Sequence, residues 1–214
     1  ITRRYSLDFC ISTPPFGFGA EDTTSEIRKQ VSFRAVGVAA ATYLKNFLAD
    51  NPEATIGTGW GRTIEQMTLQ LAGVSSPQAR FISVMGSLIA NSAYNPFEVV
   101  NMLARRTGGQ GFFLPVPFIA DSAEDRKVLI SQRSVARAME IARTVSVCFI
   151  SAGELSEDSL LRRQNMLSKS ELESLHAAGA IGDTNGIFFD KDGHQVDHEM
   201  NKRTIALGFS ELQK

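Results

Sequence analysis

Hydrophobic residues recur along this chain with two alternating periods. Between residues 36 and 48 they return every three or four positions, which predicts a helix with one buried face. The residues of that face are Val36, Ala40, Tyr43, Leu44 and Phe47. Short apolar runs at residues 54–58 and 81–85 predict buried strands instead. The chain therefore alternates between strand and helix patterns.

The same patterns predict the remaining elements. Further helices are expected at residues 63–71, 96–106 and 171–178, and as a pair between 122 and 143 that breaks near Ser131. Further strands are expected at residues 4–11, 111–117, 145–150 and 204–207. The irregular elements are a loop at residues 13–19 and a hairpin that joins 187–189 to 195–196 through a turn at 191–193.

Two helix starts carry capping residues. Asn95 can accept from the first amides of its helix, Pro96 suits the first helical position, and Glu98 adds favourable charge to the first turn. Ser168 and Glu171 have the spacing of a capping box. Both helices are therefore expected to begin where the sequence places these residues.

Strands that alternate with crossover helices predict an α/β fold with a Rossmann-like, mostly parallel sheet and helices on both faces. The hairpin predicts a small antiparallel addition to this fold. A length of 214 residues suits one domain of this kind. We see no internal repeat and no convincing interdomain linker.

Composition narrows the functional classes. A formal net charge of -1 argues against a nucleic-acid surface on this segment by itself, and no apolar run reaches the length of a membrane span. Cys10 and Cys148 are far apart in apolar runs, so we expect reduced, buried thiols in an intracellular protein. Because the chain starts at Ile1, a fragment of a longer protein is expected.

A glycine-rich segment, residues 55–63, joins a predicted strand to a predicted helix. A helix start presents unpaired amides and the positive end of the helix dipole, and Arg62 and Thr63 add donors there. The segment is either an anion cradle or an ordinary strand-to-helix turn, and the spacing alone weighs both equally. It matches neither the phosphate loop of nucleotide hydrolases nor the dinucleotide fingerprint.

Asp183 lies in a second glycine-rich segment, residues 179–186. Its carboxylate either accepts hydrogen bonds from sugar hydroxyls or closes a turn, and the turn is favoured from the residues alone. Arg162 and Arg163 either close on an anion or face solvent. The histidine spacing of residues 194 and 198 gives no convincing metal site, because no further ligand lies nearby.

Taken in order, these segments resemble the sugar-binding domain of sorbose-operon-type (SorC) transcriptional regulators. The resemblance is carried by residues 57–63, 105–109 with 114–117, 167–172, 179–193 and 201–208. It covers nearly the whole chain. It implies a Rossmann-like fold akin to sugar-phosphate isomerases and deaminases, used to sense an effector.

The resemblance also implies a ligand site. Its expected residues are Gly59, Trp60, Gly61, Arg62, Thr63, Gly86, Arg162, Arg163, Asp183 and Asn185. The loop matching residues 59–63 would cradle a phosphate, and Asp183 with Arg162 or Arg163 would contact the rest of the effector. A second phosphate site is doubtful, since residues 84–88 lack the arginine found in bisphosphate-selective relatives.

We therefore interpret residues 1–214 as an effector-binding domain truncated at both ends, without its helix-turn-helix domain and its final lysine-bearing segment. The expected partners are a sugar or sugar phosphate and, through the absent domain, operator DNA. A cytoplasmic homodimer or homotetramer is expected, without catalytic residues, metal or cofactor. The alternative is a sugar-phosphate isomerase or deaminase of the same fold, and a nicotinamide-binding module fits less well.

Overall fold

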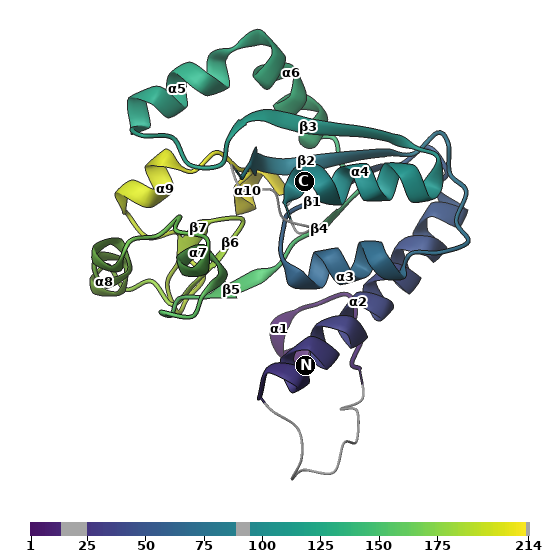
Figure 1. The fold of residues 1–214 in the computed structure, drawn as a ribbon, viewed down its shortest axis with the longest axis horizontal. Coiled ribbons are helices and arrows are strands. Elements are labelled where there is room, and N and C mark those ends of the chain that lie inside the picture. Colours follow the sequence, from purple (N-terminus) through teal and green to yellow (C-terminus); the bar gives the residue numbers. More distant parts are fainter. Residues whose placement is uncertain (14–24, 89–94, 213–214) are drawn as a thin grey trace.

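A parallel sheet forms the centre of the molecule. The computed structural model describes residues 1–13, 25–88 and 95–212. Four strands lie in the order β3-β2-β1-β4, and all three pairings are parallel. Their bounds are Thr55–Thr58 for β1, Arg80–Ser87 for β2, Gln110–Pro117 for β3 and Val147–Phe149 for β4. The predicted α/β architecture is confirmed (Figure 1).

Helices cover both faces of this sheet. One face packs against α2, α3 and α4, and the other against α5 and α6 (Figure 1). The bounds are Ser25–Asp50 for α2, Arg62–Gln70 for α3, Pro96–Thr107 for α4, Ala123–Ser131 for α5 and Arg133–Ala142 for α6. The predicted helix at residues 36–48 is therefore the carboxyl-terminal half of a longer helix.

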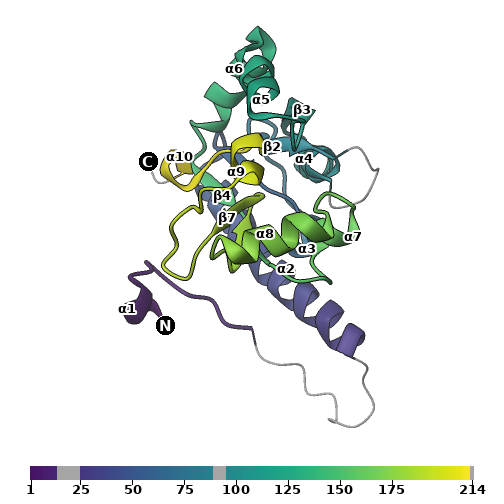
Figure 2. The ribbon, with the colours of Figure 1, turned by 90° about the vertical axis from the view of Figure 1, so that its left-hand side faces the viewer.

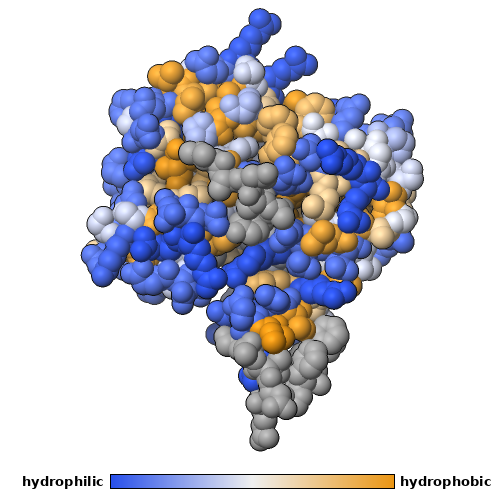
Figure 3. Space-filling view, viewed as in Figure 1, coloured by the Kyte–Doolittle hydropathy of each residue, from blue (hydrophilic) through white to orange (hydrophobic). Residues whose placement is uncertain are grey.

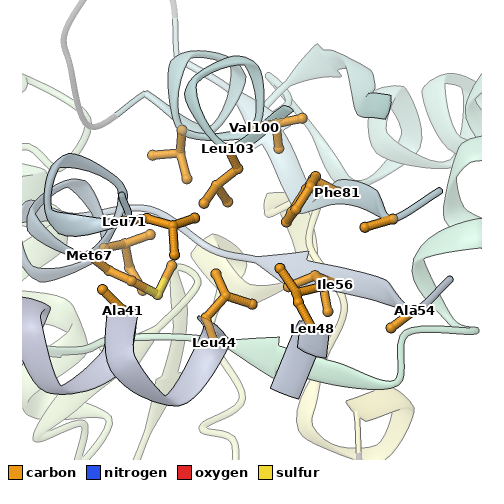
Figure 4. Close-up of a cluster of buried hydrophobic side chains, with 13 residues drawn as sticks. Ala41, Leu44, Leu48, Ala54, Ile56, Met67, Leu71, Phe81, Val100 and Leu103 are labelled. Carbon is orange, nitrogen blue, oxygen red and sulfur yellow. The ribbon is translucent and has the colours of Figure 1, made fainter. Parts of the chain in front are cut away.

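The first face holds a continuous hydrophobic core. Leu44 and Leu48 of α2 meet Ile56 of β1, while Phe81 of β2 packs beneath α4 (Figure 4). Leu44, Ile56 and Phe81 have no exposed surface. This burial stabilises the sheet that carries the glycine-rich segment, residues 55–63.

A smaller unit lies beside the carboxyl ends of the strands. Its antiparallel sheet has the order β5-β6-β7, with α7, α8 and α9 around it (Figure 2). The bounds are Ala152–Glu154 for β5, Leu160–Arg163 for α7, Lys169–Ala177 for α8, Gly182–Thr184 for β6, Ile187–Phe189 for β7 and Glu199–Arg203 for α9. The predicted antiparallel addition is confirmed, with a different pairing of strands.

The difference lies in the hairpin. β7 pairs with β6 through a turn at Asn185 and Gly186, whereas the predicted partner Gln195 makes a single bridge to Phe189. Both turn residues have positive φ, as a tight two-residue hairpin requires. The short strand β6 carries two polar residues, so its pattern did not indicate a strand.

Two other predicted strands are wrong. Residues 4–11 begin within α1 (Thr2–Tyr5) and then run irregularly, and their alternating apolar side chains are exposed. Phe9 lies 5.4 Å from the ring of Tyr43, but no sheet covers the segment. Residues 204–207 make only isolated bridges, to Ile119 and Met85, and lead toward α10 (Phe209–Leu212).

The capping predictions are confirmed. Asn95 accepts from the Phe97 amide at 3.2 Å, and Ser168 and Glu171 form a complete capping box. The two helices between residues 122 and 143 also break where expected, at Gln132. Local sequence therefore determines these boundaries.

The cysteines differ from expectation. Cys10 is exposed, and Cys148 is half-buried at the edge strand β4, where desolvation raises the pKa of its thiol to about 12. Apart from Thr13, the predicted loop at residues 13–19 lies outside the described residues. Of the helices that the structure describes, none is both long enough and apolar enough to cross a membrane.

Removing the serine of the capping box tests the local contribution to stability. We expect Ser168→Ala to lower the free energy of unfolding by about 1 kcal/mol, because the Glu171 amide loses its acceptor. Urea denaturation measures the loss, with Ser75→Ala as an exposed serine control. Equal stabilities of the two variants would contradict the capping role.

Candidate functional site

A cavity of about 320 Å³ opens at the carboxyl ends of the neighbouring strands β1 and β4. The chain leaves these two strands in different directions, β1 toward α3 and β4 toward β5. Such positions are the usual ligand sites of open parallel sheets. The cavity lies between the first half of α2, the turn from β1 to α3, and the small antiparallel unit. Its lining residues are Lys29, Phe33, Trp60, Gly61, Arg62, Thr63, Ser151, Ala152, Gly153, Glu154, Leu160, Leu161 and Asp183.

The first wall of the cavity is the start of α3. Gly61 has φ 122°, a conformation that favours glycine, and it lets the chain turn from β1 directly into the helix. No side chain caps the helix, and the first intrahelical bond runs from the Glu65 amide to the Gly61 carbonyl at 2.9 Å. The amides that precede Glu65 lie at the positive end of the helix dipole. This wall can therefore receive an anion.

Trp60 anchors the same turn. Its indole is 6% exposed and packs 5.9 Å from the ring of Phe118 in the core of the small unit. The Ser151 hydroxyl donates to the Trp60 carbonyl at 3.2 Å. The turn is thus fixed to both parts of the molecule.

Arg62 supplies a cation to this wall. Its guanidinium lies over the ring of Phe33 at 4.4 Å from the centroid. Lys29, one helical turn before Phe33 on α2, brings a second cation to the same cavity. Sequence reasoning missed both α2 residues because it began the helix at residue 36. The spacing of four between Lys29 and Phe33, which places both on one face of a helix, was the available signal.

The opposite wall carries Asp183 of β6. This residue is 7% exposed, and its Oδ2 accepts from the Gly186 amide at 2.9 Å. Burial raises the pKa of this carboxyl to about 6, although the Gly186 hydrogen bond acts to lower it. Asp183 therefore both closes the hairpin turn and borders the cavity, so the two sequence interpretations are compatible.

Gly153 makes room for this carboxylate. It is the direct partner of Asp183 in the β5–β6 ladder, and a Cβ at position 153 would collide with Asp183 Oδ1. The strand β5 was not predicted from the sequence, so this dependence was not visible there. Gly153 keeps the buried acid at the cavity wall.

Asn185 occupies the hairpin tip behind the cavity. Its side chain is 1% exposed, and among the described residues neither its Oδ1 nor its Nδ2 has a hydrogen-bond partner. The Oδ1 atom lies against Gly59, where no Cβ would fit. Asn185 and Gly59 therefore border one another and do not line the cavity.

The remaining predicted residues lie elsewhere. Gly86 lies within β2, against the carbonyl of Pro117, and its amide donates to Ile205 at 2.9 Å. Arg162 pairs with Glu157 at 3.1 Å and donates to the Leu167 carbonyl, which fixes α7 to the loop after it. Arg163 is exposed. The structure thus gathers Trp60, Gly61, Arg62, Thr63 and Asp183 around the cavity and leaves these three residues outside it.

The histidines are also outside the cavity. His198 caps α9, accepting from the Met200 amide, and its Nε2 lies 2.9 Å from the Ser174 hydroxyl. His194 is exposed. Within the part of the chain that the structure describes, no three His, Cys, Asp or Glu side chains converge to hold a metal ion.

Comparison with known proteins identifies a matching family and a related regulator. The family model "Putative sugar-binding domain" matches residues 20–214. The erythritol catabolism regulatory protein EryD of Brucella abortus is 29% identical over 202 residues, which cover 94% of this chain and 61% of that protein. The chain therefore spans about three fifths of this relative.

Solved structures share the fold. A transcriptional regulator from Streptococcus pneumoniae superimposes with a TM-score of 0.84 at 19% identity, covering 99% of this chain and 78% of that one. The full-length sorbitol operon regulator SorC from Klebsiella pneumoniae gives a TM-score of 0.76 at 17% identity, covering 98% and 64%.

The buried acid predicts a pH dependence of stability. Because the folded pKa of Asp183 is about 6 and the ordinary value is 3.8, the folded protein binds the proton more tightly. This contribution is full below the unfolded pKa and is lost as the pH rises through the folded one. Between pH 4.5 and 7, the free energy of unfolding of the wild type should fall by about 2 kcal/mol relative to that of Asp183→Asn.

Denaturation at several pH values measures this difference, with Asp121→Asn as an exposed control. Parallel profiles for wild type and Asp183→Asn would contradict it.

A second prediction concerns Gly153. We expect Gly153→Ala to destabilise the protein by about 1–3 kcal/mol, because the new methyl group overlaps the Asp183 carboxylate. Gly208→Ala is the control, since nothing lies within 4 Å of its added Cβ. If Gly153→Ala is as stable as that control, Asp183 does not need this glycine.

Proposed function

This chain belongs to the sugar-binding domain family of bacterial transcriptional regulators, and we propose that its cavity binds a sugar phosphate as the regulatory effector. One observation carries the proposal. The uncapped start of α3 with Arg62 and the buried carboxyl of Asp183 border the same small cavity. The site thus combines an anion-binding wall with a hydroxyl-binding wall.

The anion wall suits a phosphate. Amides at a helix start and a guanidinium are strong donors to phosphate oxygens, and the Thr63 hydroxyl adds one more. The cation–π contact with Phe33 limits the positions of Arg62 before a ligand arrives. Less conformational freedom is then lost on binding.

The acid wall suits hydroxyl groups. Sugar hydroxyls that donate to Asp183 stabilise its ionised form, which burial alone disfavours. Ser151 and Glu154 add polar groups to the same side of the cavity. A sugar phosphate whose hydroxyl groups face Asp183 and whose phosphate faces the start of α3 would satisfy both walls.

We propose that binding regulates the longer protein by population shift. An effector that prefers one arrangement of a homodimer or homotetramer changes how its DNA-reading parts are presented. These parts, and the final lysine-bearing segment, would lie outside residues 1–214. The regulator would act in the cytoplasm on operator DNA.

An enzyme of the same fold remains the alternative, and one observation favours it. Two acids, Glu154 and Asp183, line the same cavity. A carboxyl with a pKa of about 6 can also serve as a general base. No histidine lines the cavity, however, and the relatives are named as regulators. These observations support the sensor.

Thermal stabilisation tests the phosphate site. Erythritol, ribose and their monophosphates are compared, and the phosphorylated member of each pair should stabilise the protein more. At a concentration of a hundred times its Kd, a ligand adds about 2.7 kcal/mol to the free energy of unfolding.

Arg62→Ala should weaken the binding of the phosphorylated ligands by about 1.5–3 kcal/mol and leave the binding of the neutral ones unchanged. Arg105→Ala, at the exposed end of α4, is the matched control. Equal weakening of neutral and phosphorylated ligands by Arg62→Ala would exclude a phosphate role.

Product analysis separates sensor from enzyme. The stabilising sugar phosphate should remain chemically unchanged when NMR spectra are followed for hours with the protein. Turnover at an ordinary enzymatic rate, on the order of 1 per second, would establish the alternative instead.

A further inference from the structure

We propose that the anion site is shared by two helices, with Lys29 of α2 as a second anion ligand and Phe33 as the residue that positions Arg62. An anion in the cavity would then fasten the amino-terminal part of α2 to the start of α3. This inference rests on the proposed function, because it assumes that an anion enters the cavity.

Side chains of α2 and α3 meet at the cavity wall. Lys29 and Phe33 are four residues apart, so they lie on one face of α2, and both line the cavity. Arg62 stacks on Phe33 with its guanidinium 4.4 Å from the ring centroid. The aromatic ring thus lies between the two helices and holds the arginine at the cavity wall.

Charged groups of both signs border the cavity. Among the residues that the structure describes, the charged groups that line the cavity are Lys29 and Arg62 on the helical side and Glu154 and Asp183 on the side of β5 and β6. A phosphate monoester carries nearly two negative charges at neutral pH. One arginine compensates about half of that charge, and Lys29 is a second cation among the described residues of the cavity lining. The separation of the signs also fixes the orientation of the ligand.

The packing of α2 differs along its length. The amino-terminal part of the helix projects beyond the rest of the molecule (Figures 1 and 2). In the space-filling view it forms part of the extension below the main body (Figure 3). Residues 26–30 are exposed, whereas from Gly37 onward the helix approaches α3 so closely that an added Cβ would lie 2.8 Å from the Gln66 carbonyl carbon.

These observations divide α2 into two parts. The carboxyl-terminal part belongs to the core through Leu44 and Leu48. The amino-terminal part borders the cavity through Lys29 and Phe33, and in the described part of the chain its residues 26–30 are exposed, so an anion there adds contacts to this part of the helix. Segments with few buried contacts open most readily, and added contacts should slow that opening.

Hydrogen exchange measures both halves of the proposal in one experiment. Residues 1–214 are labelled in 100 mM inorganic phosphate and in sodium chloride of the same ionic strength. Phosphate should slow exchange at the start of α3, around residues 62–66, and in residues 26–34 of α2. In Lys29→Gln the protection of α2 should be lost and that of α3 retained, and the Kd for phosphate should rise about two- to fivefold. Lys45→Gln, another exposed lysine of α2, should behave as the wild type.

The outcomes separate this inference from the proposed function. Protection of residues 62–66 without protection of residues 26–34 would overturn the inference and leave the anion cradle in place. Absence of protection in both segments would overturn the anion cradle, and the inference with it. Equal effects of Lys29→Gln and Lys45→Gln on α2 protection would overturn the role of Lys29.

A double-mutant cycle tests Phe33 as a positioning residue. Phe33→Leu keeps an apolar side chain but removes the ring beneath the guanidinium. The variant should weaken phosphate binding when Arg62 is present and have no effect in an Arg62→Gln background. A purely structural role for Phe33 would give the same loss in both backgrounds, which would contradict positioning through Arg62.

Discussion

The start of α3 places the strongest constraint on this site, because a helix that begins without a side-chain cap leaves its first amides in need of acceptors. The parallel sheet sets the position of that helix start, since β1 delivers the chain to its carboxyl edge and Gly61 turns it at once into α3. Trp60 and Ser151 then fix the turn to the antiparallel unit. The proposed anion-binding wall is therefore a product of the backbone path as much as of Arg62.

The hairpin on the opposite wall of the cavity buries an acidic side chain. Asp183 is buried at an energetic cost that its hydrogen bond to Gly186 offsets only in part. A fold selected for stability alone would favour an uncharged residue at this position. Such departures are characteristic of functional sites, and Asp183 borders the cavity in which a ligand would supply further hydrogen bonds.

The fold could be predicted wherever one local signal sufficed. Capping residues defined the starts of α4 and α8, and apolar runs located β1 and β2. The short strands β5 and β6 were missed because each has three residues, several of them glycine or polar, and forms only by pairing with distant segments. Residues 4–11 were wrongly predicted as a strand, because an alternating pattern forms a strand only where a sheet exists to bury it.

The candidate site also combines residues that the sequence indicated with residues that it did not. The glycine loop and Asp183 were recognised as candidates in the local sequence and assigned to the site through the family resemblance, whereas Lys29 and Gly153 depend on which elements meet in space.

A crystal structure of residues 1–214 with a bound sugar monophosphate tests the central claim most directly. The account predicts that the phosphate oxygens accept hydrogen bonds from the amides at the start of α3 and from Arg62, while a sugar hydroxyl donates to Asp183. A ligand bound outside this cavity, or bound with its phosphate beside Asp183, would contradict it.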